Sequence, residues 1–188
     1  MKPGIDVLEQ PPTGLLTIHV TSSSLKAVAN AVKELFALAW PERLQSTVAD
    51  ALCLRSMSPD EFLLSCPLDA VADIKRKLRA SIKESFAVVD VSGGYVVLEL
   101  AGPDHKALLK KSTAYDVHSR NFPVGKNVNT TFAKTQVTLR SVSESQVEII
   151  VRRSYSDYVW LWIQTAAREY GLNAQRPDHN RSTVEQPT

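Results

Sequence analysis

The chain has 188 residues, 44% of them hydrophobic and 22% charged, and a formal net charge of +2. This composition is ordinary for a globular protein and excludes global disorder, and so small a net charge argues against nucleic acid or an anionic membrane as the partner. The sequence has no apolar run long enough to cross a bilayer and no signal peptide, and its two cysteines are far apart. We therefore expect a cytoplasmic protein without a disulfide framework.

Proline-rich and polar ends enclose the region that is expected to fold. Residues 1–13 contain three prolines, which predicts a flexible N-terminal tail, and the polar stretch 173–188 predicts a flexible C-terminal tail. Between the tails, residues 14–172 are expected to form a single α+β domain of two similar halves, about 14–85 and 86–172.

The first half is predicted to contain, in order, a strand, a helix, two strands and a helix. Its strands are expected at 15–20, 52–57 and 61–66. The first helix is expected to begin after the serines at 22–24, which are good N-caps, and to end at Trp40-Pro41. The second helix is indicated by apolar residues at helical spacing, which are Val71, Ile74, Leu78 and Ile82.

The second half is predicted to repeat that order. Strands at 86–91 and 95–100 flank Ser92-Gly93-Gly94, a tight hairpin signal. They are followed by a short helix at 104–110, an irregular stretch at 112–127, strands at 131–140 and 146–151, and a helix at 156–170. Because the predicted elements follow a matching order in both halves, and Leu54-Arg55-Ser56 recurs as Leu139-Arg140-Ser141 about 85 residues later, we predict a duplicated α+β unit. A chance match of so short a sequence is the alternative.

The residue patterns that catalysis or cofactor binding would need are absent from the sequence. There is no Gly-x-Ser-x-Gly elbow and no Cys-x-x-Cys pair, and the glycines at 93–94 join two predicted strands, whereas a phosphate-binding loop opens a helix. We expect no catalytic residue, no bound cofactor and no metal site in this chain. The spacing of the four histidines does not suit metal ligands; they are His19, His105, His118 and His179.

Two further features have both a structural and a functional interpretation. Asp90 interrupts an apolar run, so its carboxyl is either partly buried with a raised pKa or, as we favour, accepts hydrogen bonds from the turn amides at 92–93. A basic run on the second helix is interpreted mainly as a solvated face, with contact to an acidic partner protein as the alternative. This run comprises Lys75, Arg76, Lys77, Arg79 and Lys83.

Several stretches carry a recognisable family pattern. The stretches 90–92 (Asp-Val-Ser), 98–104 (Leu-Glu-Leu-Ala-Gly-Pro-Asp), 107–109 and 115–117 resemble the folate-binding aminomethyltransferase superfamily, whose fold is α+β with antiparallel sheets and flanking helices. Within it, the stretches 58–64, 89–92, 116–125, 151–160 and 166–171 are similar to the sarcosine oxidase gamma subunit family. This similarity extends over about residues 52–171.

The resemblance implies a subunit of a heterotetrameric complex. That complex oxidatively demethylates sarcosine to glycine, formaldehyde or methylene-tetrahydrofolate, and hydrogen peroxide. The gamma subunit is then non-catalytic and docks on the large alpha subunit, with beta and delta subunits in the same assembly. FAD, FMN, NAD and zinc are expected on the other subunits.

Two departures from the superfamily oppose a catalytic folate role for this chain. Folate-using members carry an acidic residue on the strand after the Phe-Pro-x-Gly-like loop, and the corresponding stretch 132–138 has none. The Lys-Gly-Cys motif of other relatives is also absent. A stand-alone folate-binding or aminomethyltransferase-like protein is the alternative function, and a binding module with an unrelated partner is a third.

The irregular stretch at 112–127 is predicted to contribute to a partner interface. Apolar residues on a loop often serve contacts, which favours Tyr115, Arg120, Phe122 and Pro123 as interface residues. The alternative is that Phe122 covers the core of its own domain.

The last helix is predicted to contribute the adjacent pair Trp160 and Leu161 to the same interface, because both fall off the expected core stripe. The alternative is a helix buried on both sides. The expected core stripe is Tyr155, Val159, Trp162, Ala166 and Tyr170, with Trp162 as its anchor.

Overall fold

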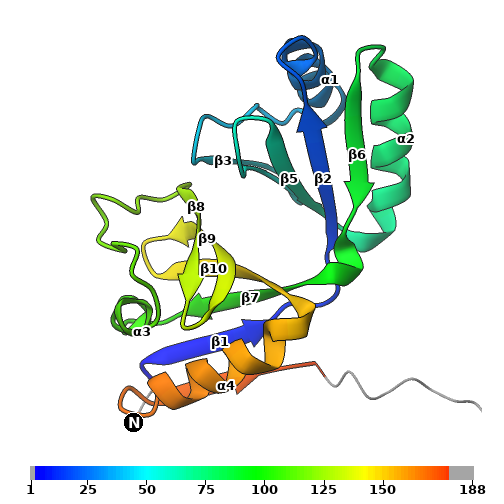
Figure 1. The fold of residues 1–188 in the computed structure, drawn as a ribbon. Helices are drawn as coiled ribbons and strands as arrows, with labels where there is room; N and C mark the ends of the chain where they lie inside the picture. The colour runs from blue at the N-terminus through cyan, green and yellow to red at the C-terminus, as the bar shows by residue number, and fades with distance from the viewer. Residues whose placement is uncertain (1–2, 178–188) are drawn as a thin grey trace, which may run out of the picture.

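Two β-sheets lie face to face, and each is covered on its outer face by two helices (Figure 1). The structure, a computed structural model, describes residues 3–177. The first sheet has five strands in the order β3 (Ser46–Ala49), β4 (Leu52–Ser56), β5 (Glu61–Cys66), β2 (Gly14–Val20) and β6 (Phe86–Asp90). All four pairings in this sheet are antiparallel.

The second sheet has six strands and includes both ends of the described chain. Its order is β11 (Leu172–Gln175), β1 (Ile5–Glu9), β7 (Tyr95–Ala101), β10 (Gln146–Arg152), β9 (Thr135–Ser143) and β8 (Asn127–Phe132). β1 and β11 run parallel, and the other pairings are antiparallel.

The helices form where apolar residues recur at helical spacing. α1 (Leu25–Phe36) and α2 (Val71–Ser81) bury their apolar stripes on the first sheet, and α3 (His105–Ser112) and α4 (Ser156–Ala166) bury theirs on the second. α1 ends earlier than the Trp40-Pro41 pair suggests, because Ala37 adopts a left-handed φ of 51°. Short 3₁₀ turns lie at η1 (Leu68–Ala70), η2 (Ser92–Gly94) and η3 (Arg153–Tyr155).

The two halves repeat the same order of elements, as the duplication hypothesis requires. Each runs β-α-β-β-β-α-β, from β2 to β6 and from β7 to β11. The recurring Leu-Arg-Ser sequences lie in equivalent strands, since Arg55 is in β4 and Arg140 in β9. β1 is an addition to the second sheet, where it separates β7 from β11.

The predicted N-terminal tail is wrong where β1 forms. Ile5 and Val7 are buried in the core of the second sheet, and β1 pairs with β7 on one side and β11 on the other. Its alternating apolar pattern is short and lies near prolines, which concealed it in the sequence. Residues 173–175 of the predicted C-terminal tail likewise belong to β11, and residues 178–188, including His179, lie outside the described part of the chain.

The predicted hairpin at Ser92-Gly93-Gly94 is also wrong. β6 pairs with β2, and β7 pairs with β1 and β10, so η2 carries the chain from one sheet to the other. β6 therefore belongs to the first sheet, and the halves meet near residue 92 rather than at 85–86. Hairpins and crossovers both need a turn there, so the turn sequence alone does not distinguish them.

Besides β1 and β11, the strands β3 and β8 were not predicted. The stretch 131–140 contains a turn at Ala133, whose φ is 52°, so β8 and β9 are separate strands. β3 is the counterpart of β8 in the first half. It is only partly buried and lacks a strong alternating pattern.

Candidate functional site

The edge strands β3 and β8 join the two sheets through a nearly symmetrical set of backbone hydrogen bonds. Gln45 and Lys126 form an antiparallel bridge between them. The amide of Ser46 donates to the carbonyl of Gly125 at 2.8 Å, and the amide of Asn127 donates to the carbonyl of Leu44 at 2.9 Å. Leu44 and Gly125, which occupy matching places, both have a positive φ, of 59° and 86°. The two halves are thus related by an approximate twofold axis through this bridge.

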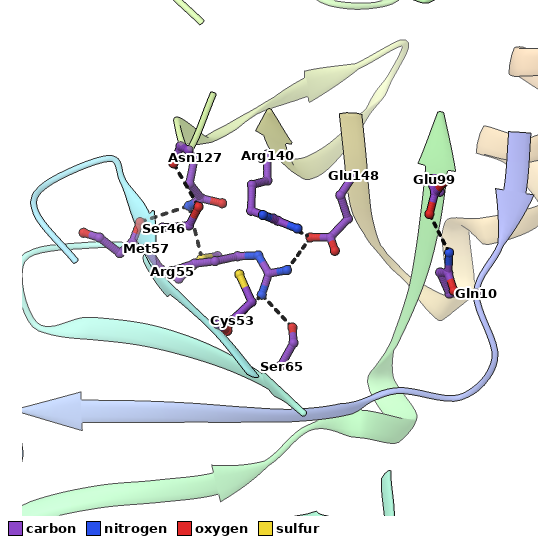
Figure 2. Close-up of polar contacts among 12 residues, drawn as sticks. Gln10, Ser46, Cys53, Arg55, Met57, Ser65, Glu99, Asn127, Arg140 and Glu148 are labelled. Atoms are coloured by element: carbon purple, nitrogen blue, oxygen red, sulfur yellow. Dashed lines mark hydrogen bonds and ion pairs between the residues drawn. The ribbon is translucent and has the colours of Figure 1, made fainter. Parts of the chain in front are cut away.

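A buried charged cluster lies beside that axis. Arg55 of β4 and Arg140 of β9 both donate to Oε1 of Glu148 on β10 (Figure 2). Arg55 also donates from Nη1 to the Ser65 hydroxyl at 2.6 Å and to the Cys53 carbonyl at 3.3 Å. The side chain of Arg55 is only 1% exposed. One carboxylate therefore connects equivalent arginines from the two halves.

The charged cluster breaks the internal symmetry at a single position. Arg55 faces Leu63 across the first sheet, whereas Arg140 faces Glu148 across the second. Leu63 is therefore the counterpart of Glu148. Duplicated arginines share a carboxylate that only one half supplies.

The cluster shifts the pKa values of the groups around it. Burial raises the pKa of the Glu148 carboxyl, but the charges of Arg55 and Arg140 outweigh burial and hold that pKa below its usual value. Burial likewise raises the pKa of the Cys53 thiol, with Arg55 and Arg140 opposing it. Burial also raises the pKa of Cys66 to about 11. Neither cysteine is thus poised as a thiolate nucleophile near neutral pH.

Further polar contacts connect the halves around this cluster. The side-chain amides of Asn127 and Asn129 donate to the carbonyls of Ser56 and Met57 at 3.0 Å and 3.3 Å. Within the second sheet, the side-chain amide of Gln10 donates to the Glu99 carboxylate at 2.8 Å (Figure 2). A small apolar cluster of Leu15, Leu63, Val97 and Ile150 fills the space between the sheets.

Two pockets of similar size lie between the sheets and are related by the approximate axis. One, of about 280 Å³, is lined by neutral polar groups such as Asn129 and Thr138 and by aliphatic side chains, and its charged lining residues are Glu61 and Arg152. The other, of about 300 Å³, contains Val48 and Cys53, the counterparts of Asn129 and Thr138, and its wall includes Arg55, Arg140 and Glu148. The charged cluster therefore lies in one pocket only.

Within residues 3–177, no group of three or more His, Cys, Asp or Glu side chains is placed to hold a metal ion. His105 is buried, and its Nδ1 lies 2.7 Å from the Gly102 carbonyl oxygen. Over the same residues, no helix is both long and apolar enough to cross a membrane.

The structure separates the four predicted interface residues of the loop. Phe122 is 4% exposed and packs in the core of the second sheet, with its ring edge-on to that of Tyr115, so the alternative interpretation of Phe122 is correct. Tyr115 is half-buried, and its hydroxyl donates to the Asn121 carbonyl. Arg120 and Pro123 are exposed, so only these two are free to contact a partner.

The predicted orientation of α4 is wrong. Trp160 is 8% exposed and belongs to the core, whereas Trp162 is only partly buried and donates from Nε1 to the Ser112 hydroxyl. Leu161, at 61% exposed, faces solvent as predicted. The helix begins at Ser156, as predicted, and Tyr155 belongs to the preceding 3₁₀ turn and is exposed, so it lies outside the buried stripe. The actual stripe is Ser156, Val159, Trp160 and Ile163, followed by Ala167.

The favoured interpretation of Asp90 as a turn acceptor is confirmed for Ser92, and no hydrogen bond links Asp90 to the amide of Gly93. The Asp90 Oδ1 accepts hydrogen bonds from the Ser92 hydroxyl at 2.6 Å and the Ser92 amide at 3.0 Å, and these bonds lower the pKa of the exposed carboxyl. Most of the basic run on α2 is exposed, and Asp73 pairs with Arg76 and Lys77. The solvated-face interpretation fits this arrangement.

Sequence reasoning identified neither the role of Arg55 nor that of Glu148. The repeated Leu-Arg-Ser sequence was a usable signal, since it places the two arginines on equivalent strands. Nothing in the sequence indicates that Glu148 lies between the two arginines, because Arg55 and Glu148 are 93 residues apart in the chain.

Comparison with known proteins gives consistent family matches. The model of the family described as "Sarcosine oxidase, gamma subunit family" matches residues 21–169. Sarcosine oxidase gamma subunits from Corynebacterium sp. (strain P-1) and Corynebacterium sp. (strain U-96) are 34% and 32% identical to this chain, over 115 and 114 residues. Each match covers 61% of this chain but only 56% and 55% of the relative, so the chain spans just over half the length of these curated relatives.

Solved structures agree with this assignment. A structure of heterotetrameric sarcosine oxidase from Corynebacterium sp. U-96 matches with a TM-score of 0.79 and 25% identity, over 88% of this chain and 85% of that chain. The glycine cleavage system aminomethyltransferase T from Bartonella henselae matches with a TM-score of 0.67 and 12% identity, over 93% of this chain and 48% of that chain, which shows the fold alone. The predicted aminomethyltransferase-like α+β fold is confirmed, and the chain belongs to the sarcosine oxidase gamma subunit family.

Proposed function

We propose that this chain is the non-catalytic gamma subunit of a heterotetrameric sarcosine oxidase, which demethylates sarcosine oxidatively to glycine, formaldehyde or methylene-tetrahydrofolate, and hydrogen peroxide. The observation that carries this proposal is the match to a chain of heterotetrameric sarcosine oxidase over 85% of that chain's length. The family model over residues 21–169 supports it independently.

The proposed role of the chain is to dock on the alpha subunit and support assembly, with beta and delta subunits in the same complex. The buried network of Arg55, Arg140 and Glu148 supports such a role, because it uses its charges to join the two halves into one rigid unit. FAD, FMN, NAD and zinc are proposed to lie on the other subunits. In this chain, Gly93 and Gly94 form a turn between sheets rather than a phosphate-binding loop at the start of a long helix.

A stand-alone folate enzyme is the less favoured function. The likeness to aminomethyltransferase T concerns the fold only. The acidic residue that the superfamily resemblance leads one to expect is missing from both strands after the loop, since β8 (Asn-Val-Asn-Thr-Thr-Phe) and β9 (Thr-Gln-Val-Thr-Leu-Arg-Ser-Val-Ser) contain no Asp or Glu.

Co-expression tests the proposal directly. The tagged chain, expressed with the alpha, beta and delta subunits of a sarcosine oxidase of the same family, is expected to co-purify with them in equal proportion and to be required for sarcosine-dependent peroxide formation. The tagged chain alone is expected to form no peroxide from sarcosine. A complex that assembles without the chain and oxidises sarcosine at full rate would refute the proposal, as would tetrahydrofolate-dependent methyl transfer by the isolated chain.

A further inference from the structure

The charged pocket between the sheets contains more positive than negative charge away from bulk water. The side chains of Arg55, Arg140 and Glu148 are 1%, 13% and 17% exposed, so two guanidinium groups share one carboxylate in a largely desolvated place. Asp50 also lines this pocket, but its side chain is exposed, so solvent weakens its charge without removing it and leaves it unable to neutralise the buried arginines. An excess charge held away from water is costly unless an ion of opposite sign accompanies it.

Hydrogen-bond donors exceed acceptors in the same place. The Nε of Arg140 donates to Oε1 of Glu148 over a long distance of 3.4 Å. The two terminal nitrogens of Arg140 have no hydrogen-bond partner within residues 3–177. The Nε of Arg55 is buried without any partner among the described residues. Of these nitrogens, the Arg55 Nε is fully buried, and a buried donor without an acceptor marks a position where an ion, a water or a ligand belongs. The terminal nitrogens of Arg140 are not fully buried, so a ligand in the pocket can reach them.

The pocket has the size and lining for a small organic acid. Its volume is about 300 Å³, at the lower end for ligand sites. Thr13 and Ser65 add hydroxyl groups to its wall, and Val48, Leu52 and Val97 add an aliphatic surface. A guanidinium is a planar fork that binds a carboxylate through two parallel hydrogen bonds. Glu148 and Asp50 would repel a second negative charge on the ligand.

We propose that this pocket is a binding site for a small aliphatic monocarboxylate. The terminal nitrogens of Arg140 hold its carboxylate in two-point contact, Arg55 and Glu148 fix the orientation of the Arg140 guanidinium, and Val48 and Leu52 contact the aliphatic part. The pocket is lined by residues of this chain alone, so it can be tested on the full chain without its partners.

Saturation-transfer NMR with sodium butyrate as the probe tests this site, with ionic strength held constant. We expect saturable binding of butyrate and none of butyramide, its neutral analogue, since only the carboxylate supplies the missing charge. Inorganic phosphate should not compete with butyrate. Arg140→Gln should weaken binding on the order of tenfold or more, because it removes a charge-assisted contact.

Two further variants locate the site. Asp50→Asn should tighten binding a few-fold by removing repulsion at the pocket mouth, and asparagine tolerates the positive φ of 50° found there. Arg152→Gln is the matched control, because Arg152 lines the other pocket, and butyrate binding should not change.

The absence of saturable butyrate binding overturns the proposal, as does equal binding of butyramide. Competition by phosphate would replace it with a general anion site. Equal weakening by Arg140→Gln and Arg152→Gln would place the binding elsewhere. If Arg140→Gln does not fold, the comparison of butyrate with butyramide and the Asp50→Asn variant still decide the matter.

Discussion

Arg55 and Glu148 lie 93 residues apart in the chain and form an ion pair across the two sheets. Arg55 comes from the first half of the fold and Glu148 from the second, so this pair is a direct side-chain link between the duplicated units. Its guanidinium is nearly inaccessible to water, which makes loss of either partner costly.

Replacing this arginine should destabilise the whole domain. Arg55→Ala is expected to lower the free energy of unfolding by about 3 kcal/mol, because Glu148 loses one of its two charged partners and the Ser65 hydroxyl loses a donor. Urea denaturation followed by tryptophan fluorescence measures the change.

Arg76→Ala is the matched control for that measurement. Arg76 also pairs with a carboxylate, that of Asp73, but both side chains are exposed. Exposed pairs contribute little, so this variant should unfold like the parent protein. Equal losses in the two variants would mean that the Arg55 pair does not hold the halves together.

The strands with strong apolar patterns were predictable from sequence, and those defined by pairing were not. β4 and β5 are buried along almost their whole length and have turn residues between them, so both were found. β1 has only five residues, and its stability depends on β7 and β11, which are distant in sequence. Long-range pairing of this kind leaves no local signal.

The charged cluster was partly predictable. The recurrence of Leu-Arg-Ser identified Arg55 and Arg140 as equivalent positions, but a repeat does not reveal which face of a sheet a residue occupies relative to another sheet. Periodicity also misplaced the core face of α4, although the start of the helix was predicted correctly, because Trp160 and Trp162 are both large and apolar and either can anchor an apolar stripe.

The two tryptophans of α4 should respond to truncation in the order of their burial. Trp160→Ala is expected to cost about 3–5 kcal/mol of unfolding free energy, as removal of a large core side chain does. Trp162→Ala should cost less, about 1–3 kcal/mol, since it loses partial burial and one hydrogen bond to Ser112. Thermal and urea denaturation of both variants measure the order.

Leu161→Ala, on the exposed face of the same helix, is the control for fold and a probe of assembly. It should leave the unfolding free energy within about 0.5 kcal/mol of the parent. A larger loss for Trp162→Ala than for Trp160→Ala would show that the helix is oriented the other way.

The N-terminal strand should be essential to the fold rather than an accessory. Ile5 is fully buried between β7 and β11, so Ile5→Ala is expected to cost about 2–5 kcal/mol of unfolding free energy. Pro11→Ala is the control, since Pro11 is exposed and lies outside the strand. Urea denaturation midpoints and amide hydrogen exchange at β7 measure the effect of each variant. Similar stability of the two variants would show that β1 is not paired as described.

His105 should make the protein less stable in mild acid. Burial lowers the pKa of its imidazole, with the hydrogen bond to the Gly102 carbonyl opposing that effect, and its Nε2 has no partner among the described residues. The fold therefore favours the neutral ring. For such a group the stabilisation is fully present above the unfolded-state pKa, about 6.5, and is lost progressively as the pH falls from there through the folded-state value.

Urea unfolding at a series of pH values from about 7.5 to 5.5 tests this dependence, since the Glu148 carboxyl, with its lowered pKa, begins to bind protons only below that range. His105→Asn retains a donor for the Gly102 carbonyl but does not titrate, so it should remove most of the loss of stability over this range. His19→Asn, at an exposed position, should leave the loss as it is in the parent protein. A parent protein whose stability is constant over this range would contradict the role assigned to His105, and so would an identical pH profile for the parent and His105→Asn.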